Sequence, residues 1–355
     1  MKMHVTALRP GDRLAADAYN PFGLLILSAG AVLDDNDINR LLLHRIEYVD
    51  IEPRLPETPG QASTDSSQAA TAVARAPNPF TRTFNAAVHD VRNIFEHIRT
   101  TGEISVQVLE TTAELLLDEL RHERDLVRVL LTSVSHDQYT YRHSVQVGSI
   151  CYYIAKWHGY AEPDCVRIGT AGLLHDIGKA RIPESILNKP GALTDEEFAF
   201  VRRHVEFGYE LIRRSFKDEW YALGALQHHE RLDGSGYPYG LKGDDIHPVG
   251  RIVAVADVYS AMISERSYRQ KKHLLEVLRE IYQMSFSQLD PHIVQTFLRQ
   301  MMPSFIGKAV RLSDGRVARI AMVYEHDWFG PLVHVEGEFI DLSREKHLRI
   351  EEFAV

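Results

Sequence analysis

Histidines, aspartates and a lysine stand in this chain at places where the surrounding pattern calls for apolar residues. In LLHDIGKARIP, residues 173–183, His175 and Asp176 follow two leucines. The pattern predicts a helix through LLHDIGKA, in which Lys179 falls in line with His175 one turn later. A carboxylate that is buried without a cation costs several kcal/mol, so a buried aspartate is normally paired or bound to a metal ion. We therefore expect a partner for this aspartate elsewhere in the chain.

Two further histidines lie on the apolar faces of expected helices. His143 falls in line with Val147 and Ile150 along YTYRHSVQVGSICYYIAKW, so its imidazole points toward the core. His204 falls in line with Gly208 in VRRHVEFGYELI, and the glycine leaves room for another group to approach. Considered singly, each histidine is better explained as a hydrogen-bonded core residue than as a metal ligand.

The remaining candidates lie beside small residues. His228 and His229 end the stretch ALGALQHH and precede a glycine-rich loop, which packing alone does not explain. Asp257 falls within VGRIVAVADVYSAMIS, a nearly apolar helix in which Gly250 and Ala254 lie on its face. An aspartate in the middle of a helix does not cap it, because capping requires a position at the helix start. A bound ion would neutralise this carboxylate.

Taken together, these side chains indicate a metal centre, because neutral imidazoles and carboxylates are ligands for zinc, iron and manganese. Cys151 and Cys165 are too few for a thiolate zinc site. The candidates exceed what one ion usually takes from a protein. Two divalent ions bridged by a carboxylate are therefore expected, with iron or manganese preferred over zinc. The expected ligands are His143, His175, Asp176, His204, His228, His229 and Asp257.

Composition narrows the class of protein. The chain has 355 residues, of which 45% are hydrophobic and 25% charged, as in soluble globular proteins. A formal net charge of −9 argues against a polymeric nucleic acid as partner, although a bound metal can still attract a small anionic substrate. Neither a membrane span nor a signal peptide is evident, and two cysteines fit a reducing compartment, so we expect a cytoplasmic protein.

The elements that must position these side chains are mainly helical. Residues 1–55 predict a small N-terminal α/β unit of unknown input, and the Pro/Ser/Ala-rich residues 56–79 predict a flexible linker. Helical periodicity extends over 80–306, and alternation around an Asp-Gly turn predicts a short β-rich element at 307–355. The helices before about Ser135 carry none of the candidate ligands. We expect them to form a homodimer surface or to transmit a signal from the N-terminal unit.

Residues 137–291 resemble the HD-GYP phosphodiesterases, a branch of the HD-domain metal-dependent phosphohydrolases. The resemblance rests on the ordered motifs DQYTYRHS, LLHDIGK, HVEFG, HHERLDGSGYP, RIVAVADVYSAMISERSYR and LDP. The HD pair is His175-Asp176, and residues 236–238 form the GYP triplet. The resemblance implies that 80–306 form a helical HD-type catalytic domain.

The resemblance also divides the expected ligands between two ions. The ligands that it implies for all HD domains are His143, His175, Asp176 and Asp257. The additions that it implies for a second ion are His204, His228 and His229, with Asp176 as the bridge. Some members hold a third metal with a glutamate at the position of Tyr139, so two ions are expected here.

Four residues acquire substrate roles through the resemblance. It implies that Lys179 contacts the scissile phosphate and that Tyr237 of the GYP loop lies beside the nucleotide. It also implies that Arg266 and Arg269 place basic groups near the substrate, although the segment SAMISERSYR differs from the usual family pattern. Asp176 and Lys179 are thus the expected catalytic residues.

The implied activity is hydrolysis of cyclic di-GMP by a metal-activated hydroxide in bacterial second-messenger signalling. The product is linear pGpG, with further hydrolysis to GMP left open. One alternative is an HD phosphohydrolase that acts on another nucleotide, such as a dNTP, ppGpp or a different cyclic dinucleotide. The other is a signalling module that binds partners such as diguanylate cyclases through its GYP loop.

Overall fold

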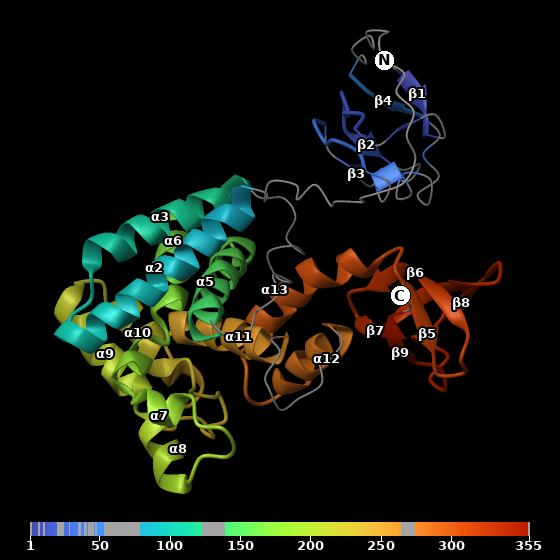
Figure 1. The fold of residues 1–355 in the computed structure, drawn as a ribbon. Coiled ribbons are helices and arrows are strands. Elements are labelled where there is room, and N and C mark those ends of the chain that lie inside the picture. The colour runs from blue at the N-terminus through green and yellow to red at the C-terminus, as the bar shows by residue number, and fades with distance from the viewer. Residues whose placement is uncertain are drawn as a thin grey trace. The chain divides into compact units, whose positions relative to one another are not determined.

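The computed structural model divides the chain into two compact units, Met1–Ala74 and Arg75–Val355. Described residues are 2–52 apart from 6–7, 10, 20–24, 28, 35–36, 39–40, 42–45 and 47, and then 79–122, 139–263 and 274–353. The predicted linker therefore falls almost entirely outside the described residues. The mainly helical fold, with a small N-terminal unit and a C-terminal sheet, is confirmed (Figure 1).

The N-terminal unit combines two short strand pairs around its own core. Strand β1, Lys2–His4, pairs antiparallel with β4, Tyr48–Asp50. Strand β2, Ala18–Tyr19, pairs antiparallel with β3, Leu25–Leu27. Apolar side chains fill this core, including Val5, Leu14, Leu33, Leu41 and Ile51.

The second unit opens with two helices that bury their apolar faces within the unit. Helix α2 spans Pro79–Thr101 and helix α3 spans Val106–His122. Phe84 and Val91 of α2 and Leu116 of α3 join the large core that contains the central helices. These apolar faces pack against two further helices of the same unit, α5, Tyr139–His158, and α6, Glu162–Leu174.

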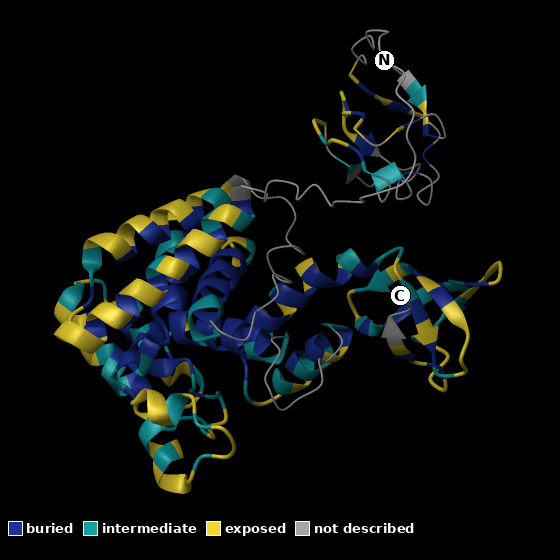
Figure 2. Cartoon of the chain, viewed as in Figure 1, coloured by how far each residue is buried: buried dark blue, intermediate teal, exposed yellow. Residues whose placement is uncertain are grey.

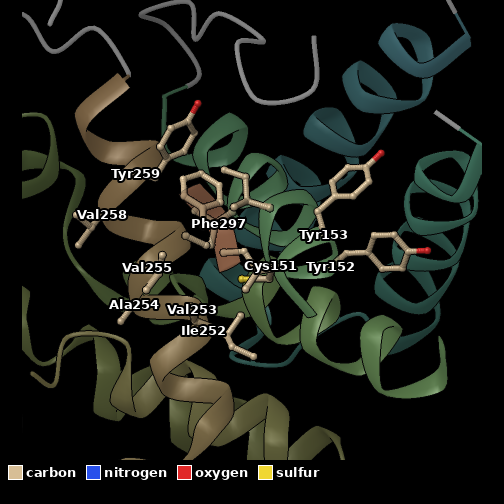
Figure 3. Packing of buried hydrophobic residues seen from close by; sticks show 14 of the residues in the cluster. Cys151, Tyr152, Tyr153, Ile252, Val253, Ala254, Val255, Val258, Tyr259 and Phe297 are labelled. Atoms are coloured by element: carbon tan, nitrogen blue, oxygen red, sulfur yellow. The ribbon is translucent and has the colours of Figure 1, made fainter. Parts of the chain in front are cut away.

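Helices α5, Tyr139–His158, and α11, Pro248–Ile263, form the centre of this unit and are buried along most of their length (Figure 2). Cys151 on α5 lies beside Ile252 and Val253 of α11 in Figure 3. Tyr259 of α11 meets Phe297 with 5.0 Å between ring centroids. This apolar packing fixes the position of α11, the helix that carries the expected ligand Asp257 in its interior.

The predicted helix through LLHDIGKA is wrong, because it breaks within the motif. Helix α6, Glu162–Leu174, ends just before His175, and a 3-10 helix, η3, covers Ile177–Arg181. A β-carbon at Gly178 would overlap the His204 carbonyl oxygen, so only glycine allows η3 to lie this close to the next ligand segment. The break turns Asp176 out of helical geometry.

The remaining helices continue around this centre. Helix α8, Asp195–Arg202, begins with a capping box between Thr194 and Glu197. The predicted helix through VRRHVEFG is also interrupted, because α8 ends at Arg202 and α9 begins at His204. The other elements are α7, Glu184–Leu187, α9, His204–Ser215, α10, Glu219–Gln227, η4, Gly243–Asp245, α12, Leu274–Met284, α13, Pro291–Met301, and η5, Met302–Phe305.

The chain ends in a five-stranded antiparallel sheet of order β8-β7-β6-β5-β9. The Asp-Gly turn joins β5 to β6 as predicted, and Gly315 there has a φ of +88°. Buried Ile320 and Val333 connect the sheet to the large core. The strands are β5, Ala309–Leu312, β6, Val317–Tyr324, β7, Asp327–Val335, β8, Glu338–Asp341, and β9, Ile350–Phe353.

Within the described parts of the chain, none of the helices combines the length and apolar character that crossing a bilayer requires.

Candidate metal centre

The structure brings all of the predicted ligands together from five helical elements. His143 comes from α5 and Asp257 from α11, while the other five lie at helix ends. His175 and Asp176 follow the end of α6, His204 begins α9, and His228 and His229 follow α10. Helices α5 and α6 can cross closely because a β-carbon at Gly172 would lie 2.7 Å from Cys151 Sγ.

Three of the histidines are oriented by the chain's own backbone. The Nδ1 atom of His175 lies 2.7 Å from the Gly172 carbonyl oxygen. His204 Nδ1 lies 2.8 Å from Val201 O, and His228 Nδ1 lies 2.9 Å from Ala225 O. A carbonyl only accepts, so each Nδ1 carries the proton and donates. The Nε2 atom of each neutral ring is therefore left with a lone pair, as metal ligation requires.

His143 reaches the same state through two side chains. Ser260 Oγ donates to Gln146 Oε1 over 2.7 Å, so its oxygen can accept from His143 Nδ1 at 2.9 Å. The Nε2 atom of His143 then faces Asp257 Oδ1 at 3.0 Å. Ser260 and Gln146 thus select the tautomer that presents Nε2 to the centre.

Several of the atoms that face one another at the centre are hydrogen-bond acceptors without a donor. The Nε2 atoms of His204 and His228 lie 3.4 Å apart, and backbone carbonyls already hold both Nδ1 protons. His175 Nε2 and Asp176 Oδ1 are buried and have no hydrogen-bond partner. Lone pairs facing one another repel unless a cation lies between them. This donor set therefore fits a divalent metal site.

Candidate ligand atoms gather in three overlapping groups, within each of which they lie within 4.8 Å of one another. The groups share His175 and His228, and Asp176 Oδ1 also lies 3.3 Å from His204 Nε2. Asp176 therefore touches ligands of more than one group. The members are His204, His228 and His229 in the first group, His143, His175 and Asp257 in the second, and His175, Asp176 and His228 in the third.

The charge states of the centre suit a cation. Burial lowers the pKa of His204 to about 4 and that of His229 to about 3, so both rings are neutral at neutral pH. Burial alone would raise the pKa of Asp176, but the nearby Lys179 ammonium and His175 reverse this effect and hold it well below its usual value. The imidazoles of His204 and His229 are thus neutral, and the Asp176 carboxylate is ionised.

Lys179 meets the centre through Asp176. Its Nζ atom lies 2.6 Å from Asp176 Oδ2. The predicted alignment of Lys179 with His175 on one helical stripe is wrong, because η3 replaces the helix there. The ammonium is consequently placed against the carboxylate that lies between the ligand groups.

The GYP loop packs directly on the centre. The Tyr237 ring stacks on His229 with 4.6 Å between centroids, and its backbone N–H donates to the His229 carbonyl. The buried carboxylate of Glu230 accepts from the backbone N–H groups of Tyr239 and Leu241 over 2.7 and 3.0 Å. These bonds hold the GYP loop in place against His229, one of the expected metal ligands.

Two predicted substrate residues, Arg266 and Arg269, lie outside the described residues. Tyr139 occupies the position at which some HD-GYP members carry a glutamate for a third metal. Its ring stacks on His143 with 5.6 Å between ring centroids. A phenol at this position supplies no carboxylate.

Several residues that shape the site went unnoticed in the sequence. Ser260 lies three residues after Asp257, and Gln146 lies three residues after His143, so each faces the centre from a ligand's own helix. That spacing on a buried face was the available signal. Glu230 and Arg231 carried no local signal, although Arg231 donates to the carbonyls of His228 and Glu230.

Comparison with known proteins shows what this part of the chain is similar to. Residues 127–293 match the family model described as HD domain. A cyclic di-GMP phosphodiesterase of Pseudomonas aeruginosa is 36% identical over 236 residues, which cover 64% of this chain and 56% of the relative. A cyclic di-GMP phosphodiesterase of Thermotoga maritima is 43% identical over 223 residues, which cover 59% of this chain and 60% of the relative.

Other relatives widen the range of named substrates. A 3'3'-cGAMP-specific phosphodiesterase of Vibrio cholerae is 37% identical over 203 residues, covering 56% of this chain and 39% of the relative. A solved HDG"Y"P protein from Bdellovibrio bacteriovorus aligns with a TM-score of 0.50 at 17% identity, covering 83% of this chain and 97% of that one. This last likeness concerns the fold alone.

Residues 127–293 match the HD domain model, and the clustered histidines and aspartates all lie within these residues. The GYP loop folds against His229 in the part of the chain that is similar to the two cyclic di-GMP phosphodiesterases. The chain spans little more than half the length of the first two relatives, 56% and 60%.

Proposed function

We propose that this protein is a metal-dependent phosphodiesterase that hydrolyses cyclic di-GMP to pGpG. The convergence of four buried imidazoles, each with an oriented Nδ1 and a bare Nε2, on two buried aspartates carries the proposal. The names of the relatives point to cyclic dinucleotides as the substrate class. A second hydrolysis would convert pGpG to GMP, and analysis of the products distinguishes the two.

Two divalent ions are the proposed cofactors, held by His143, His175, Asp176, His204, His228, His229 and Asp257, with Asp176 as the bridge. Such ions supply a nucleophile from water at neutral pH and neutralise charge on phosphoryl oxygens. The donor atoms are all nitrogen or oxygen, which supports iron or manganese. The overlap of the three ligand groups at His175 and His228 supports two adjacent ions.

The chain's own side chains take the remaining steps. The Lys179 ammonium, 2.6 Å from Asp176, is placed to bind a phosphoryl oxygen and to donate a proton to the leaving 3′-oxygen. Tyr237, stacked on His229, limits access of water and offers its edge to the nucleotide. Arg266 and Arg269 are further candidates for substrate binding that lie outside the described residues.

The test is hydrolysis of cyclic di-GMP by protein purified without air and supplied with manganese or ferrous iron. Asp176→Ala should lower turnover by at least about a thousandfold, with reduced metal content and an unchanged circular dichroism spectrum. Asp195→Ala, an exposed aspartate in the first turn of α8, is the matched control and should keep full activity. Undiminished turnover by Asp176→Ala would refute the proposal.

A second candidate is hydrolysis of another cyclic dinucleotide. The cGAMP-specific relative in Vibrio cholerae supports it. A side-by-side comparison of kcat/KM for cyclic di-GMP, 3'3'-cGAMP and cyclic di-AMP decides between the substrates. Co-purification with a diguanylate cyclase, reduced in Tyr237→Ala, would instead support a role in partner binding.

A further inference from the structure

A chain of ring contacts leads from the metal centre to a helix that carries no ligand. Tyr237 stacks on His229 at 4.6 Å with 27° between the rings. The guanidinium carbon of Arg202, at the end of α8, lies 4.2 Å from the centroid of the same tyrosine ring. A cation at this distance from an aromatic ring is attracted to it. Arg202 is therefore held beside the centre by a contact that does not use its hydrogen-bond donors.

Those donors remain available within the described parts of the chain, where neither a hydrogen bond nor an ion pair engages the Arg202 guanidinium. The neighbouring cations are committed. Lys179 binds Asp176, and Arg231 donates to two backbone carbonyls. Arg203, the next residue, lies 3.8 Å from Glu206 and over the Phe207 ring. An arginine on an aromatic ring keeps its planar edge free for an oxyanion.

The substrate class needs a second cation. A cyclic dinucleotide carries two phosphates, and the metal centre with Lys179 accounts for the one that is cleaved. The second phosphate remains charged, in a protein whose formal net charge is −9. A phosphate that leaves water without gaining a cation or a hydrogen-bond donor weakens binding.

We propose that Arg202 binds the second, uncleaved phosphate of the cyclic dinucleotide, with Tyr237 holding the guanidinium in position. This assignment rests on the proposed function. It makes Arg202 a residue for substrates with two phosphates, whereas the metal centre alone handles a single phosphodiester. The two roles can be measured separately, because a small diester reaches only the centre.

The experiment compares Arg202→Gln with Arg203→Gln on cyclic di-GMP and on the chromogenic diester bis(p-nitrophenyl) phosphate. Arg202→Gln should raise KM for cyclic di-GMP about tenfold, the effect of losing one charged hydrogen-bonded contact, with kcat within about twofold. Hydrolysis of the small diester should be unchanged. Arg202→Lys should recover part of the lost affinity, and Arg203→Gln should match wild type on both substrates.

Inhibition of diester cleavage keeps the test independent of turnover. The concentration of cyclic di-GMP that half-inhibits bis(p-nitrophenyl) phosphate cleavage should rise about tenfold in Arg202→Gln. The same rise for cyclic di-AMP would support phosphate binding, whereas a rise confined to guanine-containing ligands would overturn it. Equal losses on both substrates would show that Arg202 acts only through Tyr237. If wild type cleaves the small diester but no cyclic dinucleotide, the proposed function fails while the inhibition data still judge Arg202.

Discussion

Two regions of the same compact unit bury their side chains by different rules. Among the described residues of the C-terminal sheet, 309–351, every buried side chain is apolar or small, as in Val310, Ile320 and Val333. The helical centre instead buries polar and charged groups in its middle. These are His143, His175, Asp176, His204, His228 and Asp257.

In the sheet, the side chains that point inward are apolar, as the alternation of a half-buried strand requires. The helical centre departs from that rule at several neighbouring positions. Buried polar groups that lack partners reduce stability, so their concentration in one place indicates a function. The following predictions test whether the two regions differ in this way.

The largest effect should follow removal of metal. Chelation should abolish phosphodiester hydrolysis and lower the melting temperature, because the bare imidazole and carboxylate acceptors are left facing one another. A ligand present at a thousand times its Kd stabilises a fold by about 4 kcal/mol. Turnover and thermal unfolding, measured before and after reloading with manganese, check the expectation. Full turnover by protein shown to be free of metal would contradict it.

The second effect concerns the sheet. Ile320 on β6 is 2% exposed, and Ile320→Ala should lower the free energy of unfolding by about 2–5 kcal/mol. Metal content per folded chain should not change, since strand β6 carries none of the expected ligands. Denaturant unfolding with metal analysis measures both quantities. The control is Val317→Thr at an exposed position of the same strand, for which a change within about 0.5 kcal/mol is expected.

The smallest effect should come from the partner of a ligand. Ser260→Ala removes the group that orients His143 Nδ1, and metal affinity should fall about 10- to 100-fold with little change in stability. Ser149→Ala is the matched control, since Ser149 is also buried but donates only to the Val145 carbonyl of its own helix. Metal titration of chelated protein provides the measurement. An equal effect of both variants would show that the loss is structural.

The same comparison explains what the sequence could predict. The alternating sheet and the apolar helices follow from local periodicity, and the ligands were visible because histidines and aspartates interrupted it. His175 and Asp176 were recognised within LLHDIGKA, but the end of the helix at Leu174, just before them, was not. That break depends on the approach of Gly178 to the His204 carbonyl, a contact across 26 residues of sequence.

The residues that orient a ligand or hold the GYP loop could not be predicted from the sequence either. A serine such as Ser260 in an apolar helix commonly bonds its own backbone, as Ser149 does. Only the folded position of α11 against α5 shows that it meets His143. The role of Glu230 in holding two backbone N–H groups of the loop likewise depends on a turn that periodicity does not specify.

Gly178 has a consequence for how this centre could be lost. The segment that carries Asp176 can approach His204 only because the glycine has no side chain, so the spacing between two ligand-bearing segments depends on a residue that binds nothing. Replacing it with alanine would push those segments apart while every ligand stayed in the sequence. A homologue could therefore keep every ligand residue and still have no metal centre. A comparison of ligand residues alone would count such a homologue as active.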